Sequence, residues 1–129
     1  MAPRRNVLWS KEEEQVLALV WAEHSQPGPN IRYWPTVYNH YVACAPDHAP
    51  ARTEKQLRDH WQRMSRKVQD FNRIYRDQLR APQPGQTDEY LRTRAAETYL
   101  EEHGHSFTKF FVWETLRDNP KWRQYCGEL

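Results

Sequence analysis

The sequence of 129 residues has few cysteines and glycines and no long hydrophobic run. Its two cysteines, Cys44 and Cys126, are too few for the disulfide framework of a small secreted domain. No apolar stretch approaches the ~20 residues of a membrane-spanning helix, and the first residues lack the apolar segment of a signal peptide. The sequence therefore predicts a soluble intracellular protein with no membrane partner.

Motifs for catalysis and for metal binding are also missing. With only four glycines there is no glycine-rich phosphate loop, and no G-x-S-x-G motif occurs. A zinc site would have to combine Cys44 and His48 with Cys126 and either His103 or His105, without any CxxC or HExxH motif. We therefore expect no enzyme activity, no metal site and no cofactor.

The chain does contain many aromatic residues on a polar background. Aromatic residues make up 13% of the sequence and include six tryptophans, while 28% of the residues are charged. Disordered chains lack such bulky apolar groups. A chain of this length can bury a single core, so we expect a small core built from a few large side chains.

The net charge of +2 is unevenly distributed along the chain. Residues 52–80 carry nine basic and four acidic side chains, a net charge of +5, whereas the segments before and after them carry −1 and −2. A local basic surface of this kind attracts nucleic acid. The middle of the chain is therefore the candidate region for binding.

The clear periodic patterns in the sequence are helical. Residues 10–24 open with a capping box, Ser10 with Glu13, and then repeat apolar residues at spacings of three and four. Residues 33–44 carry a similar apolar stripe. No segment alternates cleanly with period two, so we predict an all-α protein with five helices and no sheet.

The third predicted helix follows a second capping box, Thr53 with Gln56, and runs for about 26 residues, or ~39 Å. Its apolar stripe consists of Leu57, Trp61, Met64, Val68, Phe71 and Tyr75. The opposite side carries Lys55, Asp59, Gln62, Arg66 and Arg73, flanked by Arg58, Arg63 and Arg76. We expect the apolar stripe to be core and the basic side to be exposed.

Two more helices are predicted after the linker at 81–86. The first spans 88–103 and ends at Gly104, and the second spans 107–118, with Ser106 or Thr108 as its cap. The apolar stripe of the third helix must be covered either by these helices or by a second copy in a coiled coil. We favour the first alternative, because the linker is short and the C-terminal helices have aromatic faces to bury.

Two stretches resemble the Myb/SANT module, in which each of three helices contributes an aromatic residue to a small core. Residues 9–17 read W-S-K-E-E-E-Q-V-L, and residues 52–61 read R-T-E-K-Q-L-R-D-H-W. The long loop before the second helix, the pair Tyr33–Trp34 and the extended third helix are similar to plant trihelix-type Myb proteins. The resemblance implies a three-helix module at 1–80, with a C-terminal extension at 81–129 packed on its third helix.

The second half of the chain is similar to Myb-like proteins with a no-apical-meristem-associated C-terminal region. Some proteins of this kind accompany Harbinger-type transposases as their DNA-binding partner. The residues that carry the likeness are Ala95, Tyr99, Phe107, Trp113, Leu116, Arg117, Pro120, Lys121 and Trp122.

The resemblance implies binding of double-stranded DNA through the third helix in the major groove. Carried over by position, Lys55, Arg58 and Asp59 would read bases, and Lys and Arg suit guanine. Asp59 stands where the family usually has Asn, and it lies four residues from both Lys55 and Arg63, which favours a helical salt bridge. The full predicted DNA-binding set is Arg52, Lys55, Arg58, Asp59, Gln62, Arg63, Arg66 and Arg73.

We therefore expect a nuclear, sequence-specific DNA-binding protein that acts as a transcription regulator or as a transposase-associated adaptor. Its protein partner would bind through the C-terminal helices, and the chain itself would be a monomer or weak homodimer. The alternative is a SANT-type interaction module that binds chromatin or a partner protein without direct base readout.

Overall fold

The computed structural model describes residues 7–24, 32–80 and 84–128, which form six α-helices and no strand. Helix accounts for 71% of the structure, and the all-α prediction is confirmed. The helices are α1 (Lys11–Glu23), α2 (Tyr33–Cys44), α3 (Glu54–Leu79), α4 (Asp88–His103), α5 (Phe110–Leu116) and α6 (Pro120–Tyr125). The first four coincide closely with the predicted ranges.

The predicted helix ends are formed by the expected caps. The Ser10 hydroxyl accepts a hydrogen bond from the Glu13 amide and the Glu13 carboxylate accepts one from the Ser10 amide, both at 3.1 Å. Thr53 and Gln56 make the same reciprocal pair at the start of α3. Gly104 ends α4 in the left-handed conformation, at φ 76°.

The C-terminal end of the chain departs from the prediction, because a sixth helix forms where a tail was expected. Asn119 and Pro120 do not only end the preceding helix: the Asn119 side chain accepts a hydrogen bond from the Trp122 amide, and Pro120 occupies the first turn of α6. Asn at the N-cap followed by Pro is a helix-start signal. Helix α5 begins at Phe110 after Lys109, which makes no side-chain cap, so neither Ser106 nor Thr108 caps it.

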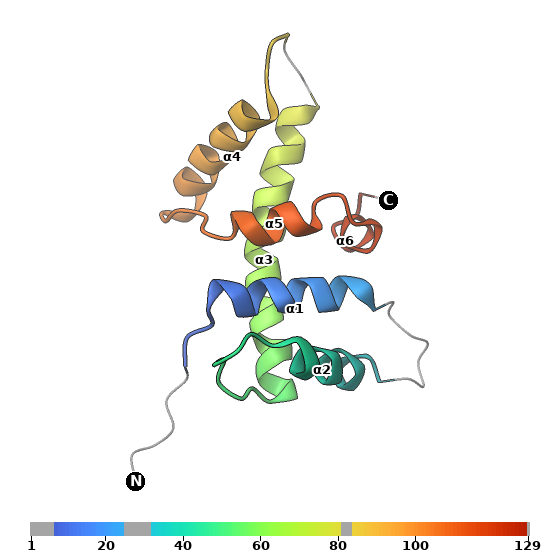
Figure 1. Cartoon of the computed structure of the whole chain (residues 1–129). Coiled ribbons are helices and arrows are strands. Elements are labelled where there is room, and N and C mark those ends of the chain that lie inside the picture. The colour runs from blue at the N-terminus through green and yellow to red at the C-terminus, as the bar shows by residue number, and fades with distance from the viewer. Residues whose placement is uncertain (1–6, 25–31, 81–83, 129) are drawn as a thin grey trace. The chain divides into compact units, whose positions relative to one another are not determined.

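The chain divides into two compact units, Met1–Trp61 and Gln62–Leu129, and helix α3 contributes to both. The division lies inside this helix, whereas the sequence suggested a boundary at the linker after residue 80. In the first unit, α1 and α2 lie beside the N-terminal part of α3 (Figure 1). Buried apolar side chains from all three helices, among them Leu17, Val37 and Leu57, form its core.

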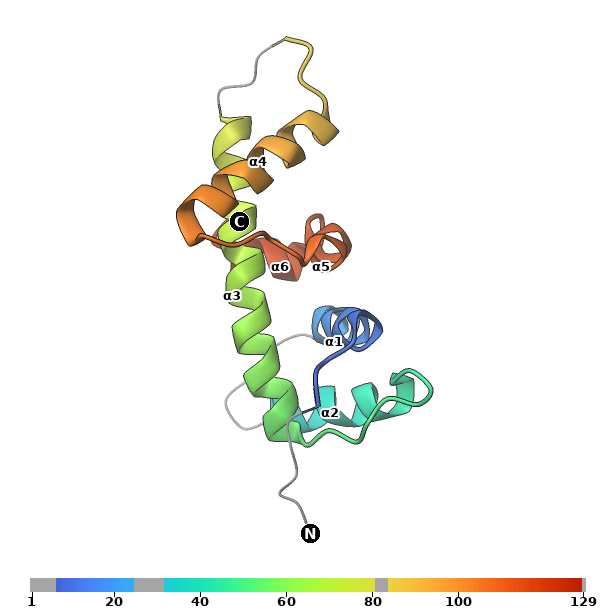
Figure 2. The ribbon, with the colours of Figure 1, turned by 90° about the vertical axis from the view of Figure 1, so that its left-hand side faces the viewer.

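In the second unit, the C-terminal part of α3 is covered by α4, α5 and α6 (Figure 2). The Phe71 ring stacks on Phe107 with centroids 4.3 Å apart, and Tyr75 contacts Trp113 at 4.8 Å. Val68 and Phe71 have no exposed surface at all. The prediction that the C-terminal helices fold back onto the apolar stripe is therefore confirmed within this unit.

Candidate nucleic-acid interface

The start of α3 is held in the first unit by stacked tryptophans. The rings of Trp21 and Trp61 lie 4.4 Å apart, and both side chains are buried. The Myb resemblance implies that an aromatic residue of the second helix, here Trp34, joins this cluster, but Trp34 is only half-buried and its ring contacts Tyr33 edge-on at 5.6 Å. On α2 the core positions are Val37 and Tyr41 instead, four residues apart on the buried side of the helix.

Arg52 is buried just before α3, in contact with Glu13 of α1. Its Nε donates to Glu13 at 2.9 Å and its Nη2 at 3.1 Å, while Nη1 donates to the Val7 carbonyl at 2.6 Å. Burial would raise the pKa of Glu13, but the hydrogen bonds from Arg52 and the Ser10 amide outweigh it and lower that pKa. Arg52 was predicted to contact DNA; in the structure its side chain is buried and bonded to Glu13, so it is not part of the exposed basic side of α3.

A second pair joins α1 to α3, between the buried Glu14 and the half-buried His60. His60 and Glu14 are in contact at 2.8 Å, and the Trp9 ring stacks on His60 with centroids 4.3 Å apart. The Arg52 guanidinium lies over the same Trp9 ring, 4.5 Å from its centroid. The sequence pattern did not reveal this arrangement, because Glu14 and His60 look like surface residues until the helices are placed.

The exposed side of the first turns of α3 carries Lys55 and Asp59. Their side chains form an ion pair at 2.6 Å, as their spacing of four residues predicts. Lys55 is 75% exposed, so this pair is in contact with solvent and contributes little to stability. Asp59 therefore neutralises the charge of Lys55 in the protein without DNA. To contact a base or a phosphate, Lys55 would first have to break this ion pair.

The remaining predicted cations of this side of α3 form no ion pair within the described part of the chain. Arg58 is half-buried at the first unit's end of the helix. In the second unit Gln62, Arg63 and Arg66 are exposed, and the sequence-adjacent Lys67 is exposed as well. On a helix of 3.6 residues per turn, Arg58, Gln62 and Arg66 follow one another at four-residue steps along one side. We call Arg58, Gln62, Arg63 and Arg66 the basic face of α3.

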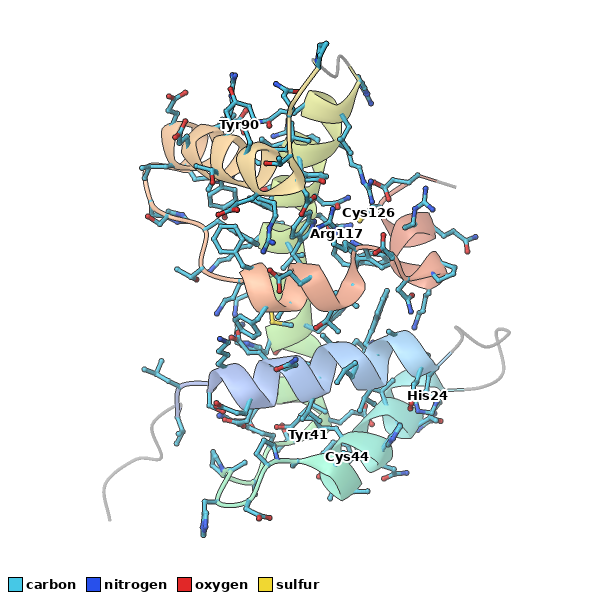
Figure 3. All side chains as sticks on the ribbon, turned by 45° about the horizontal axis from the view of Figure 1, so that its top comes forward. His24, Tyr41, Cys44, Tyr90, Arg117 and Cys126 are labelled. Atoms are coloured by element: carbon cyan, nitrogen blue, oxygen red, sulfur yellow. The ribbon has the colours of Figure 1, made fainter. Side chains whose placement is uncertain are left out.

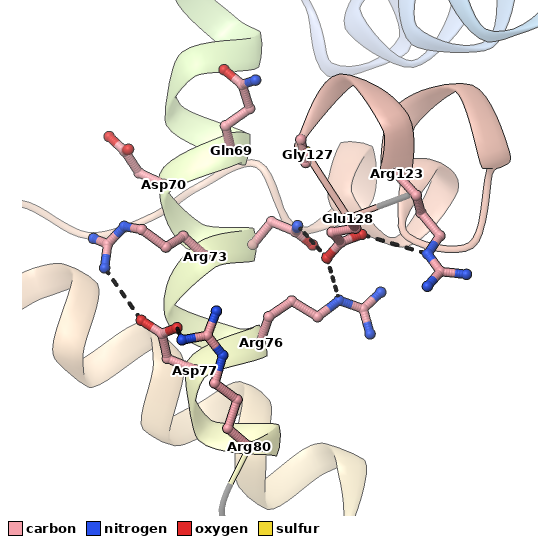
Figure 4. Close-up of a pocket in the computed structure, with 11 residues that line it drawn as sticks. Gln69, Asp70, Arg73, Arg76, Asp77, Arg80, Arg123, Gly127 and Glu128 are labelled. Carbon is pink, nitrogen blue, oxygen red and sulfur yellow. Dashed lines mark hydrogen bonds and ion pairs between the residues drawn. The ribbon is translucent and has the colours of Figure 1, made fainter.

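Arg73 lies further along α3, at an open cavity of about 630 Å³ in the second unit (Figure 4). It pairs with Asp77 at 3.6 Å and with Glu102 of α4 at 2.9 Å. Arg76, at the same cavity, pairs with Glu128 at 2.7 Å. These arginines hold the helices of the second unit to one another, so the structure separates Arg73 from the unpaired cations of the basic face.

The second unit is also held by a polar cluster around Arg117. Arg117 donates to Asp88 at 2.8 Å and to the Tyr75 hydroxyl at 2.8 Å, and Tyr75 itself donates to Asp88. The hydrogen bond from Arg117 lowers the pKa of Asp88 to about 2. Within the same unit, the Trp113 indole donates to the Asn72 side chain at 3.0 Å. These bonds fix α4 and α5 on α3.

Two cysteines and one histidine considered above as zinc ligands have defined surroundings, each within its own unit. Cys44 and Cys126 are free thiols, the first exposed and the second half-buried. Burial raises the pKa of Cys126 to about 12, so its thiol is protonated at neutral pH. His103 stacks on Tyr99 with centroids 4.1 Å apart.

No helix in the described part of the chain has the length and apolar character needed to cross a membrane.

The fold and these contacts define an all-α protein with a basic helix face and internal ion pairs. The sequence profile for the N-terminal region of micro-spherule protein matches residues 2–110, which is most of the chain. This chain therefore belongs to the family of the micro-spherule protein N-terminal region. The family is one of nuclear, chromatin-associated proteins.

One curated protein with detectable similarity is Glutathione S-transferase T3 of Arabidopsis thaliana. It is 24% identical over 128 residues, an alignment that covers 88% of this chain and 20% of that protein. The chain thus spans about a fifth of the length of this relative. No solved structure matches the chain significantly.

Proposed function

We propose that this chain is a nuclear module that binds double-stranded DNA through the exposed side of α3. It would do so as part of a chromatin-associated or transcription-regulating assembly. The observation that carries the proposal is the basic face, Arg58, Gln62, Arg63 and Arg66, whose three arginines form no ion pair in the described part of the chain. An α-helix fits the major groove, and Arg donates two hydrogen bonds to guanine. Family membership supports a nuclear location.

The residues near the start of α3 and those further along the helix would contact different parts of the DNA. Arg58 and Lys55 lie in the first two turns of α3, where the resemblance to Myb modules implies base reading. Arg63 and Arg66 lie further along the helix and suit phosphates, because an arginine contacts phosphate without regard to sequence. Lys55 competes with its own ion pair to Asp59, so Arg58 is the stronger candidate for base reading.

The ion pairs at the start of α3 support the proposal through rigidity. The Arg52–Glu13 contact joins α1 to the residues just before α3, and the His60–Glu14 contact joins α1 to the helix itself. A helix held in this way loses little conformational freedom when it enters a groove, which lowers the entropic cost of binding. The Trp21–Trp61 stack has the same effect on the apolar side of the helix.

The second candidate is a protein-interaction module of the SANT type, and one observation favours it. Two of the predicted DNA contacts are neutralised inside the chain, Lys55 by Asp59 and Arg73 by Asp77 and Glu102. A mixed surface of cations and acids binds charged peptide segments as readily as it binds a polyanion. The two candidates differ in the dependence of binding on salt and on base sequence.

Selection from a pool of random duplexes tests the proposal. The DNA-binding candidate predicts enrichment of a short guanine-containing motif by the wild-type chain, and loss of that motif in Arg58→Ala with general duplex binding retained. Arg80→Ala is a matched control, because Arg80 is an exposed arginine near the end of α3 that pairs with Asp77. Failure of the wild-type chain to enrich any sequence, together with no retention of duplexes, would favour the protein-interaction candidate.

A further inference from the structure

Three side chains with metal-binding atoms meet in the first unit, and none of them belongs to the basic face of α3. Glu23 is the last residue of α1, His24 follows it as the C-cap, and His40 lies on α2. The His24 Nε2 and His40 Nδ1 atoms are 2.9 Å apart, and Glu23 Oε2 lies 3.4 Å from His40 Nδ1. Figure 3 labels His24 where α1 ends.

The spacing of these three atoms matches that of ligands around one small cation. All three lie within 4.8 Å of one another. Tetrahedral zinc with bonds of about 2.0–2.1 Å keeps its ligand atoms roughly 3.3 Å apart. The His24–His40 and Glu23–His40 separations, 2.9 and 3.4 Å, lie on either side of this value.

We propose that Glu23, His24 and His40 bind a zinc ion between the end of α1 and helix α2. Two imidazole nitrogens with one carboxylate oxygen suit Zn²⁺, whereas Mg²⁺ and Ca²⁺ require oxygen ligands. Three protein ligands leave the fourth tetrahedral position to water. The His40 side chain is 31% exposed and Glu23 is 67% exposed, so the ion can enter directly from solvent.

The contact between the two rings shows what zinc has to replace. At 2.9 Å, one of the facing nitrogens donates a hydrogen bond to the other, so a single proton lies between them. For both nitrogens to offer a lone pair, the donating ring must carry its proton on its other nitrogen. The zinc ion then occupies the place of the proton between the two facing nitrogens.

Zinc at this position would join the two helices that support the start of α3. A ligand that binds only the folded state stabilises it by mass action. The site shares no residue with the basic face, so it neither rests on the proposed DNA binding nor tests it. The sequence alone did not predict this zinc site, because His24 and His40 are 16 residues apart and belong to no known spacing motif.

Calorimetric titration of the chelator-treated full chain with zinc chloride tests the site. We expect one zinc ion per chain and a rise in the thermal unfolding midpoint, with no rise in magnesium chloride at the same concentration. His24→Ala and His40→Ala should each weaken zinc binding at least tenfold, and Glu23→Gln should weaken it less. Cobalt should bind the same site and give the visible absorption of a four-coordinate centre.

Two controls in the first unit separate this site from unspecific binding. His48→Asn removes another imidazole at a residue with φ 68°, a left-handed conformation that Asn adopts readily, and it should bind zinc like the wild type. Cys44→Ser removes the exposed thiol and should do the same. The proposal is overturned if zinc causes no heat and no stabilisation, or if its affinity is unchanged in both His24→Ala and His40→Ala or depends on Cys44.

Discussion

Arg52 and Glu13 form a two-contact ion pair, Nε to Oε2 at 2.9 Å and Nη2 to Oε1 at 3.1 Å, with both side chains almost fully buried. These residues belong to the two sequence stretches that resemble Myb modules, 9–17 and 52–61. The two stretches therefore share a resemblance to the same module and are also joined by a direct ion pair in the structure. Arg52, which was predicted to contact DNA, holds the start of α3 against α1 instead of standing free on the surface.

Removing one partner of this pair should be costly. Arg52→Met keeps the aliphatic part of the side chain but leaves the Glu13 carboxylate buried without its partner, and such a change costs about 3–5 kcal/mol. Urea denaturation followed by circular dichroism measures the loss. Adding Glu13→Gln to Arg52→Met should recover part of it, because the unpaired charge is gone. A loss below about 1 kcal/mol in Arg52→Met would show that the pair is not needed for folding.

The tryptophan stack gives a second prediction. Trp61→Ala deletes a side chain that is 2% exposed and in contact with Trp21, and it should lower the free energy of unfolding by about 3–5 kcal/mol. Trp34→Ala is the matched control, because the same atoms are removed from a half-buried position. Thermal unfolding should show a much smaller change for Trp34→Ala. Equal changes in the two variants would contradict the core described above.

The helices of this protein could be predicted from sequence because each carries local signals. The capping boxes at Ser10 and Thr53 and the glycine at 104 depend on residues within a turn of each other, and all three formed as expected. Helix α6 was missed because Asn119–Pro120 both ends one helix and starts the next. A proline after a helical stretch is usually interpreted as the end of that helix, so its second role in the first turn of a new helix is easily overlooked.

The candidate sites were less predictable, because they depend on pairs that only the fold brings together. Lys55 and Asp59 are four residues apart, and their ion pair was foreseen. Arg52 with Glu13, and Arg73 with Glu102, are separated by 39 and 29 residues, and nothing in the local pattern marks them as partners. Charge density predicts where cations are, whereas the tertiary structure decides which of them remain unpaired.

Truncation after Leu79 should uncover the second half of α3. Phe71 and Tyr75 would lose their contacts with Phe107 and Trp113, and an apolar stripe of this size is rare on a monomer. We expect the truncated chain to self-associate or to bind a hydrophobic dye, measured by analytical ultracentrifugation and fluorescence. A monomeric fragment with the stability of the full chain would contradict the role assigned to the C-terminal helices.

The cluster of Asp88 with Arg117 should make part of the stability depend on acid. The pKa of Asp88 is lowered to about 2 in the folded state, so its contribution is complete above the ordinary pKa near 3.8 and is lost as the pH falls towards 2. Because the Asp88 side chain is 47% exposed, solvent screening limits the contribution to about 1 kcal/mol or less. Denaturation midpoints between pH 5 and pH 2 should fall less steeply for Asp88→Asn than for the wild type. Parallel curves for the two proteins would exclude Asp88 as a source of the acid dependence.

The salt dependence of duplex binding tests the central proposal most directly. Fluorescence anisotropy of a labelled duplex, measured over a range of salt concentrations, gives the number of phosphates neutralised from the slope of log K against log salt. Triple replacement of Arg58, Arg63 and Arg66 by alanine should lower the affinity strongly and reduce the slope by about two units, if Arg58 reads a base and the other two contact phosphates. The control triple variant, Arg32, Arg80 and Arg94 to alanine, loses the same charge elsewhere and should keep most of the affinity and the slope. Equal losses in the two triple variants, or no duplex binding by the wild-type chain, would contradict DNA binding through α3.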